Sequence, residues 1–121
     1  MKRTHIVVVD DDLAVRDALK FALETEGLSA ETCASGRQLL DSGALSRADC
    51  LVLDCKMPDL DGFAVIAELE ARKVTLPVIL MTVPVTDAVQ RRARAAGAFS
   101  LLEKPLLNGV LTDNIRRATG A

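Results

Sequence analysis

The stretch that decides the fold of this chain is Leu51-Val52-Leu53-Asp54-Cys55-Lys56-Met57-Pro58-Asp59-Leu60-Asp61-Gly62. Its three consecutive apolar residues indicate a strand buried on both faces, and the strand ends on the carboxylate of Asp54. Gly62 closes the loop before an apolar-periodic helix begins at Phe63. In α/β proteins, the carboxyl end of a buried strand lies at the sheet edge where ligands bind. A lone aspartate there could equally start a turn or cap a helix, so the rest of the chain has to decide.

The length of 121 residues predicts one domain, residues 1–121, with a single core. A hydrophobic fraction of 50% with 26% charged residues is typical of a folded domain. The net charge of −2 argues against a general nucleic-acid binder. No apolar run approaches the roughly 18 residues of a membrane span. We therefore expect a cytoplasmic domain without direct contact to nucleic acid or membrane.

The cysteines and the single histidine suggest neither a disulfide framework nor a zinc site. The cysteine count is odd and no Cys-x-x-Cys is present. We expect Cys33 and Cys50 to be small buried side chains. Cys55 follows an acid whose charge would raise the pKa of the thiol, which disfavours redox sensing. His5 is expected at the surface.

Apolar runs and helix boundaries alternate along the whole chain. Strands are expected at 5–9, 28–33, 50–53, 77–81 and 98–102, the second of them at a sheet edge. Helices are expected at 13–26 after Asp12, briefly after Ser35, at 63–72, to residue 96 after Thr86 or Asp87, and around Leu107, Val110, Leu111 and Ile115. Such alternation requires parallel strands with helices on both faces. We predict a flavodoxin-like (βα)5 three-layer sandwich with strand order 2-1-3-4-5.

Polar side chains follow four of the predicted strands. They are Asp10 and Asp11 after the first strand, Asp54 after the third, Thr82 after the fourth and Lys104 after the fifth. In this topology they converge on one end of the sheet, where clustered carboxylates would raise one another's pKa values. A hard divalent cation relieves that repulsion, so the pattern predicts a magnesium or manganese site.

The same cluster predicts phosphoryl chemistry. An ionised Asp54 can attack phosphorus and form an acyl phosphate. The cation and the Lys104 ammonium would compensate the charge on the transferred group, and the Thr82 hydroxyl could donate to one of its oxygens.

On these motifs the chain resembles the receiver domains of two-component response regulators, in particular FixJ-type receivers, over essentially its whole length. The matching segments are Val9-Asp10-Asp11, Asp54 through Pro58 and on to Gly62, Thr82, Gly97-Ala98 and Lys104-Pro105. The resemblance implies that Asp54 accepts a phosphoryl group from a histidine kinase or phosphotransfer protein. Such a domain catalyses its own phosphorylation and is not a turnover enzyme.

The resemblance also implies the roles of the surrounding groups. Asp11 and Asp54 would bind Mg²⁺ or Mn²⁺, with Asp10 mostly through water and the backbone carbonyl of Lys56 as a further ligand. Thr82, the backbone N–H of Val83 and Lys104 would contact the phosphoryl group.

Two positions depart from the family pattern. Val83, followed by Pro84, stands where a small residue is usual, and Leu101 stands where an aromatic residue is usual. Pro84 restricts Val83 to extended backbone angles and stiffens the loop. We therefore expect phosphorylation and switching to be weakly coupled.

The predicted output surface is formed by the helix that ends at residue 96, the fifth strand and the last helix. Phe99 and Leu101 lie two residues apart in the expected strand and should point to the same side. Arginines flank them at positions 91, 92, 94, 116 and 117; Arg91 and Arg94 are the members we assign to the surface. An apolar centre with a basic rim predicts a homodimer or partner contact. The alternative is a solvated face with Phe99 partly covered by arginine stems.

Three other classes of protein compete with this interpretation. A haloacid dehalogenase-type hydrolase needs a second aspartate two residues after the nucleophile, where this chain has Lys56. A flavodoxin-like flavin binder would need a hydroxyl- and glycine-rich loop after the first strand, where this chain has three aspartates. A degenerate receiver that binds proteins without being phosphorylated remains open because of Val83. The sequence also leaves open whether the domain stands alone or belongs to a longer regulator.

Overall fold

The computed structural model describes residues 3–106 and 109–121, and it places five strands in one parallel sheet. The strands are β1 (His5–Val9), β2 (Ser29–Cys33), β3 (Cys50–Asp54), β4 (Val78–Thr82) and β5 (Ser100–Glu103). Their order is β2-β1-β3-β4-β5, so the predicted flavodoxin-like topology and the edge position of β2 are confirmed.

The helices follow the strands in alternation. They are α1 (Leu13–Thr25), α2 (Gly36–Asp41), α3 (Gly62–Ala71), α4 (Asp87–Ala95) and α5 (Val110–Thr119), with a short 3-10 turn η1 (Ala44–Ser46) after α2. The expected position Leu107 of the last helix lies outside the described residues. Among the residues that the structure describes, no helix combines the length and apolar character that a membrane crossing needs.

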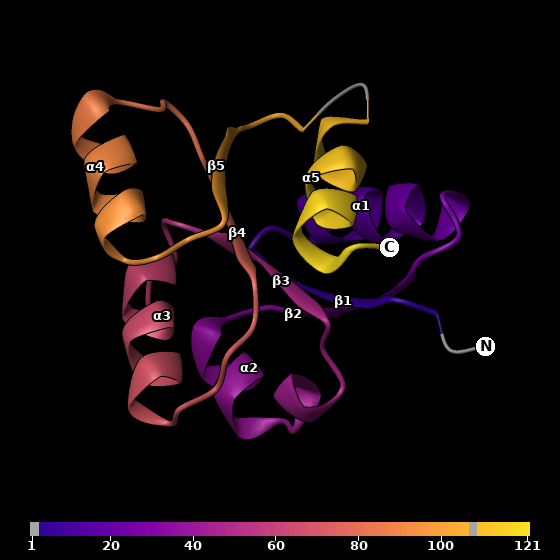
Figure 1. Cartoon of the computed structure of the whole chain (residues 1–121), viewed down its shortest axis with the longest axis horizontal. Coiled ribbons are helices and arrows are strands. Elements are labelled where there is room, and N and C mark those ends of the chain that lie inside the picture. Colours follow the sequence, from indigo (N-terminus) through magenta and orange to yellow (C-terminus); the bar gives the residue numbers. More distant parts are fainter. Residues whose placement is uncertain (1–2, 107–108) are drawn as a thin grey trace.

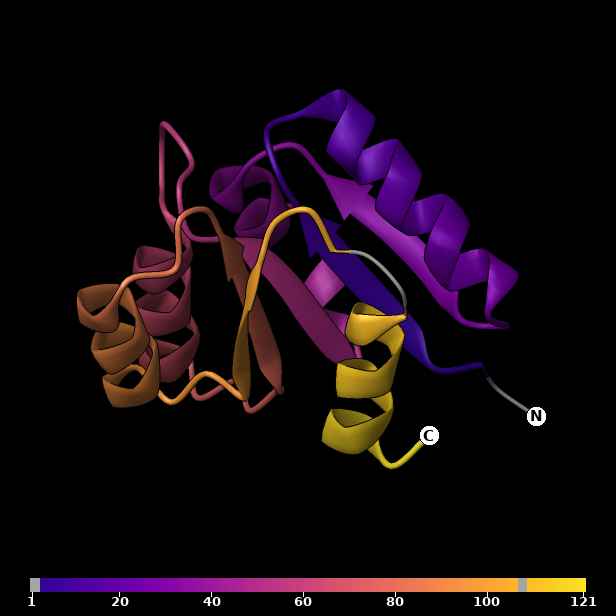
Figure 2. The same cartoon turned by 90° about the horizontal axis from the view of Figure 1, so that it is seen from above.

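Two apolar layers enclose the sheet, and the helices divide between them (Figures 1 and 2). One layer joins alternate side chains of the strands to α2, α3 and α4. The other joins the opposite strand faces to α1 and α5. Every residue of β3 and of β4 is buried, as expected for strands covered on both faces. The polar ends of these strands therefore follow fully buried segments inside the sheet.

Side-chain caps fix where the helices begin. The Asp12 carboxylate accepts the N–H groups of Ala14 and Val15, and Ser35 caps α2, both as predicted. Thr86, rather than Asp87, caps α4 through the N–H of Val89. An unforeseen cap at Asp61 starts α3 at Gly62, one residue before the predicted start.

Gly62 lies against the backbone of β3. A Cβ atom at this position would come 2.7 Å from the carbonyl oxygen of Asp54 and 3.2 Å from the Cα of Cys55. Only glycine allows this approach, because real Cβ atoms do not come so close to backbone atoms. Gly62 thus sets how the loop after Asp54 folds back onto the strand.

The fifth strand starts later than predicted. Ala98 N–H donates to the carbonyl of Ala93 and closes α4, and Phe99 N–H donates to Val78 before β5 begins at Ser100. The remaining boundaries differ from the predictions by a residue or two.

The cysteines are free and buried, as predicted for Cys33 and Cys50. His5 differs from expectation. Its side chain is only 16% exposed, because Nδ1 lies 2.7 Å from Ser29 Oγ and Nε2 lies 2.7 Å from Glu31 Oε1.

Candidate functional site

The ends of β1, β3 and β5 bring two buried carboxylates and one ammonium together. Lys104 Nζ lies 2.7 Å from Asp10 Oδ2 and 2.7 Å from Asp54 Oδ2. The other oxygen of each carboxylate accepts a backbone N–H two residues further on, from Asp12 and Lys56 respectively, at 2.9 Å. Each acid is therefore held on one side by its own loop and on the other by Lys104.

Asp11 completes an acidic group at the same edge. One carboxylate oxygen from each of Asp10, Asp11 and Asp54 lies within 4.8 Å of the others. Asp10 and Asp54 are buried, whereas Asp11 is exposed. The set offers only hard oxygen donors, which fit Mg²⁺ or Mn²⁺. The acids that the sequence placed at two strand ends are therefore close enough to share one cation.

Burial governs the protonation of the site. Burial raises the pKa of Asp54 above its ordinary value, and the hydrogen bonds from Lys104 and from the Lys56 backbone offset only part of that rise. Burial alone would lower the pKa of Lys104, but its hydrogen bonds to Asp10 and Asp54 outweigh it and the pKa is raised. Lys104 thus stays charged, and additional positive charge would favour the ionised form of Asp54.

Thr82 ends β4 beside the same site. The residue is 1% exposed, and its hydroxyl oxygen makes no hydrogen bond to any residue that the structure describes. Its carbonyl accepts the backbone N–H of Lys104 at 2.8 Å. Thr82 is thus tied to β5 through its backbone and keeps a free hydroxyl.

The loop after β4 carries Val83, which is 51% exposed. Its carbonyl accepts a hydrogen bond from Lys56 Nζ at 2.9 Å, and Val85 N–H donates to Glu103 Oε2 at 3.0 Å. The Val83–Pro84 and Lys104–Pro105 peptide bonds are cis.

Two cavities flank the site. One of about 490 Å³ has apolar walls from α1 and from the two loops that carry Val83 and Lys104. The other, of about 480 Å³, lies between the loop after β3 and α4, and Cys55, Thr82 and Phe63 are among its lining residues.

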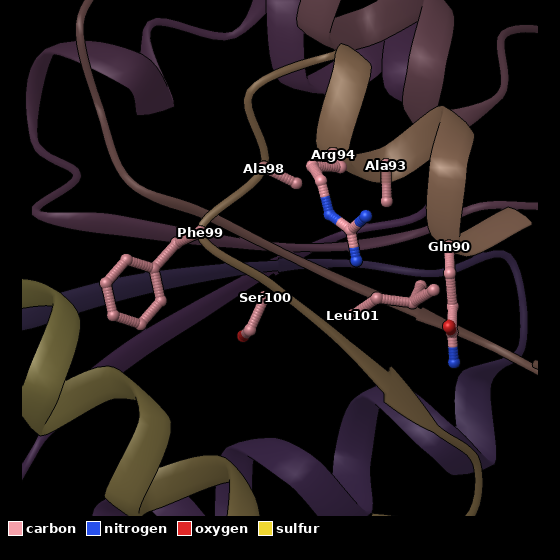
Figure 3. A pocket seen from close by; sticks show the side chains of 7 residues that line it. All are labelled: Gln90, Ala93, Arg94, Ala98, Phe99, Ser100 and Leu101. Atoms are coloured by element: carbon pink, nitrogen blue, oxygen red, sulfur yellow. The ribbon is translucent and has the colours of Figure 1, made fainter.

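The side chains of the expected output surface do not all face the same way. A cavity of about 270 Å³ lies between α4 and β5, and Figure 3 shows Leu101 pointing toward Gln90 while the ring of Phe99 points away. This corrects the expectation that Phe99 and Leu101 point to the same side. Phe99 precedes β5, so strand alternation does not set its direction.

The arginines that the sequence assigned to the rim of the output surface divide into two groups. Arg91 and Arg94 are exposed on α4, and Arg94 lines the cavity (Figure 3). Arg92 instead stacks over the Phe63 ring at 4.1 Å from its centroid, and Arg116 donates to the carbonyl of Glu26. The basic rim is therefore narrower than the sequence indicated.

This combination of fold and strand-end residues defines a protein family. The response regulator receiver domain matches residues 6–116, and the chain belongs to this family.

Relatives include the C4-dicarboxylate transport transcriptional regulatory protein DctD of Pseudomonas aeruginosa, 34% identical over 96% of this chain and 25% of that protein. The response regulator MprA of Mycolicibacterium vanbaalenii is 42% identical over 84% of this chain and 44% of the relative. The transcriptional regulatory protein FixJ of Azorhizobium caulinodans is 35% identical over 93% of this chain and 54% of that protein. The chain thus spans about half, or less, of the length of these relatives.

Solved structures agree with the fold. The crystal structure of FixJ-N has a TM-score of 0.85 at 30% identity, covering 99% of this chain and 96% of that one. A response regulator receiver domain protein from Clostridium thermocellum has a TM-score of 0.88 at 28% identity, covering 97% of this chain and 94% of that one.

Sequence reasoning missed the side chain of Lys56, which was assigned a role only through its backbone carbonyl. The structure places its ammonium on the carbonyl of Val83. It also missed Glu103, which holds the far end of the same loop.

Proposed function

We propose that the chain is a phosphoacceptor and that Asp54 is the residue phosphorylated. The observation that carries the proposal is the contact of one ammonium, that of Lys104, with both buried acids at 2.7 Å. A free Asp54 oxygen lone pair attacks phosphorus, and the bond from phosphorus to the donor's leaving group breaks as the new P–O bond forms. With a phosphohistidine donor, the imidazole departs with the bonding electron pair and takes up a proton.

The described residues supply positioning and charge compensation, which dominate phosphoryl transfer. The Lys56 backbone N–H fixes Asp54 Oδ1, so the carboxylate cannot rotate freely. Lys104 would balance negative charge on the transferred group, and the unpartnered Thr82 hydroxyl is available as a donor to one of its oxygens. The backbone N–H of Val83, the next residue, would donate to another. The domain acts on itself and does not turn over substrate.

Asp10, Asp11, Asp54 and the carbonyl of Lys56 would hold Mg²⁺ or Mn²⁺. The donor set is all oxygen, and three of these groups already lie within 4.8 Å of one another. A bound cation supplies charge neutralisation at the phosphoryl oxygens. The chain's own part is to keep the acids together, and Lys104 does so by pairing with two of them.

The test is phosphorylation by acetyl phosphate, with and without a divalent cation. We expect labelling of the parent only with the cation, and none of Asp54→Asn. Equal labelling of the parent and this variant would show that another residue is the acceptor. If the parent is neither labelled nor bound by beryllofluoride with magnesium, the chain is a degenerate receiver that works as a binding module.

We propose that a histidine kinase or phosphotransfer protein is the natural donor, and that the domain works in the cytoplasm without touching nucleic acid itself. Family membership supports this assignment. A kinase from the same genome should transfer phosphate to the parent and not to Asp54→Asn.

We propose a homodimer or partner contact through α4, β5 and α5. Phe99 is 45% exposed and Val110 of α5 is 38% exposed, and the exposed Arg91 and Arg94 lie on α4. Sedimentation of the beryllofluoride form over a range of concentrations should show dimer for the parent and a weaker dimer for Phe99→Ala. A monomer at every concentration, with Phe99→Ala behaving like the parent toward its kinase, would remove this surface from consideration.

A further inference from the structure

Lys56 contacts both sides of the candidate phosphorylation site. Its backbone N–H donates to Asp54 Oδ1 at 2.9 Å, and its side-chain ammonium donates to the carbonyl oxygen of Val83 at 2.9 Å. These two acceptors belong to the ends of β3 and β4, which are neighbours in the sheet. One exposed residue thus links the phosphoacceptor to the loop that follows β4.

The loop after β4, residues 83–86, is held at several points. The carbonyl of Thr82 accepts Lys104 N–H at 2.8 Å, and the carbonyl of Val83 accepts Lys56 Nζ. Further on, Val85 N–H donates to Glu103 Oε2 at 3.0 Å. The Thr82 carbonyl and the Val83 N–H belong to the same peptide unit, so Lys104 and Lys56 together fix the peptide groups on either side of the Val83 Cα.

We infer that the Lys56 side chain is a positioning residue, a tether that holds residues 83–86 across the mouth of the site before any phosphoryl group arrives. The inference rests on the proposed function, because it assigns the tether to a site at which Val83 N–H and the Thr82 hydroxyl meet the transferred group. By holding the Val83 carbonyl, Lys56 orders these two donors in advance. Donors ordered in advance cost less free energy to align when the phosphoryl group binds.

The tether itself is tested in the free protein, without any phosphoryl chemistry. Lys56→Met removes the ammonium and keeps an unbranched side chain of similar length. We expect the Val83 carbonyl ¹³C resonance to shift, and the Val85 amide to exchange about fivefold faster, as for the loss of one exposed charge-assisted hydrogen bond. Lys56→Arg keeps a cationic donor and should restore most of both signals. Unchanged Val83 and Val85 signals in Lys56→Met would overturn the inference.

Binding of beryllofluoride with magnesium tests the consequence for the site. Lys56→Met should bind it about fivefold more weakly than the parent, because the loop must then be ordered on binding. Glu103→Ala is the matched variant: it frees the same loop at Val85 but removes a negative charge. If Lys56→Met weakens binding because the loop has lost its order, Glu103→Ala should weaken binding as well. If Lys56→Met weakens binding because positive charge near Asp54 is lost, Glu103→Ala should strengthen binding, and that result would overturn the role of the tether.

The two arms separate failure of the inference from failure of the proposed function. A parent that binds no beryllofluoride would refute the phosphoacceptor assignment whatever the Val83 signals show. A parent that binds normally, together with Lys56→Met that binds equally well, would refute only the tether.

Discussion

The ammonium of Lys104 lies 2.7 Å from the carboxylate of Asp54, although the two residues are 50 positions apart in the chain. The same ammonium holds Asp10. Asp10 and Asp54, residues that are 0% and 5% exposed, thus share one positive charge, and we expect the stability of this end of the sheet to depend on it.

Replacing Lys104 by methionine should destabilise the free protein strongly. The change leaves two buried carboxylates without their cation, which costs about 3–5 kcal/mol when a buried pair is broken in this way. Protonation of the raised-pKa Asp54 would reduce that cost. Urea unfolding measures the effect, with Lys20→Met as control because Lys20 forms an exposed salt bridge with Glu24 on α1. Equal losses in the two variants would contradict a structural role for the shared ammonium.

Magnesium should stabilise the fold by binding the native acids. A cation at ten times its dissociation constant adds about 1.4 kcal/mol to the free energy of unfolding. Asp11→Asn should weaken this response while leaving the metal-free protein as stable as the parent or slightly more so, because Asp11 is exposed and its charge only adds repulsion. Thermal melts with and without the cation report both effects. An identical magnesium response in the variant would exclude Asp11 as a ligand.

Gly62→Ala should destabilise the fold and slow phosphorylation together. The new Cβ would lie 2.7 Å from the Asp54 carbonyl oxygen, so β3 or the start of α3 has to move at a cost of about 1–3 kcal/mol. Gly27→Ala is a useful comparison, since its positive φ also disfavours alanine but the space around it is open. It should lose about 1 kcal/mol and keep the parent's phosphorylation rate. A Gly62→Ala variant phosphorylated as fast as the parent would show that Asp54 tolerates the displacement.

The ion cluster at the β1–β2 end should make stability depend on acid pH. Hydrogen bonds from Arg47, and more weakly from His5, lower the pKa of Glu31 below its ordinary value of 4.5. A lowered folded-state pKa contributes stability above pH 4.5, and this contribution is lost as the pH falls through the folded-state value. Glu31→Gln should therefore be less stable than the parent near neutral pH, with the difference shrinking in acid. A constant difference between about pH 7 and about pH 3 would assign the effect to packing.

Activation should change the structure little. Val83 already has its carbonyl held, and Leu101 has no ring to turn inward or hydroxyl to bond. A ligand shifts a conformational equilibrium only by its differential affinity for the two states. Chemical shifts of the free and beryllofluoride forms should differ mainly near Asp54. Large changes throughout α4 and β5 would show that this chain switches fully despite Val83 and Leu101. A Val83→Ala variant that is phosphorylated no faster than the parent would show that the valine does not obstruct Asp54.

The sequence predicted the arrangement wherever a buried strand ends on a polar group. The runs before Asp10, Asp54 and Thr82 are buried on both sides, so the strand order alone brings their ends together. Two features were missed because each depends on a local hydrogen bond: at Asp61 the carboxylate accepts the Ala64 N–H and caps α3, and before β5 the Ala98 N–H donates to the Ala93 carbonyl.

The side-chain contact of Lys56 could not have been predicted in the same way. A lysine has many rotamers, and its acceptor is a main-chain carbonyl 27 positions away, which any residue type would provide. The same holds for Arg92, whose stacking on Phe63 depends on how α4 lies against α3. Patterns of residue types predict which elements pack together, whereas the partner of a long exposed side chain depends on which acceptors the folded structure brings within its reach.

The buried thiol of Cys55 is a built-in reporter on the opening of the candidate site. The thiol follows Asp54 directly and lines the cavity beside Thr82, and burial raises its pKa to about 11. A reagent that needs the thiolate can therefore modify it only when the loop after β3 opens. The rate of thiol modification at Cys55 would therefore measure how often the site opens, without any added label. In a variant with both Cys33→Ser and Cys50→Ala, Cys55 is the remaining thiol and the measured rate belongs to it.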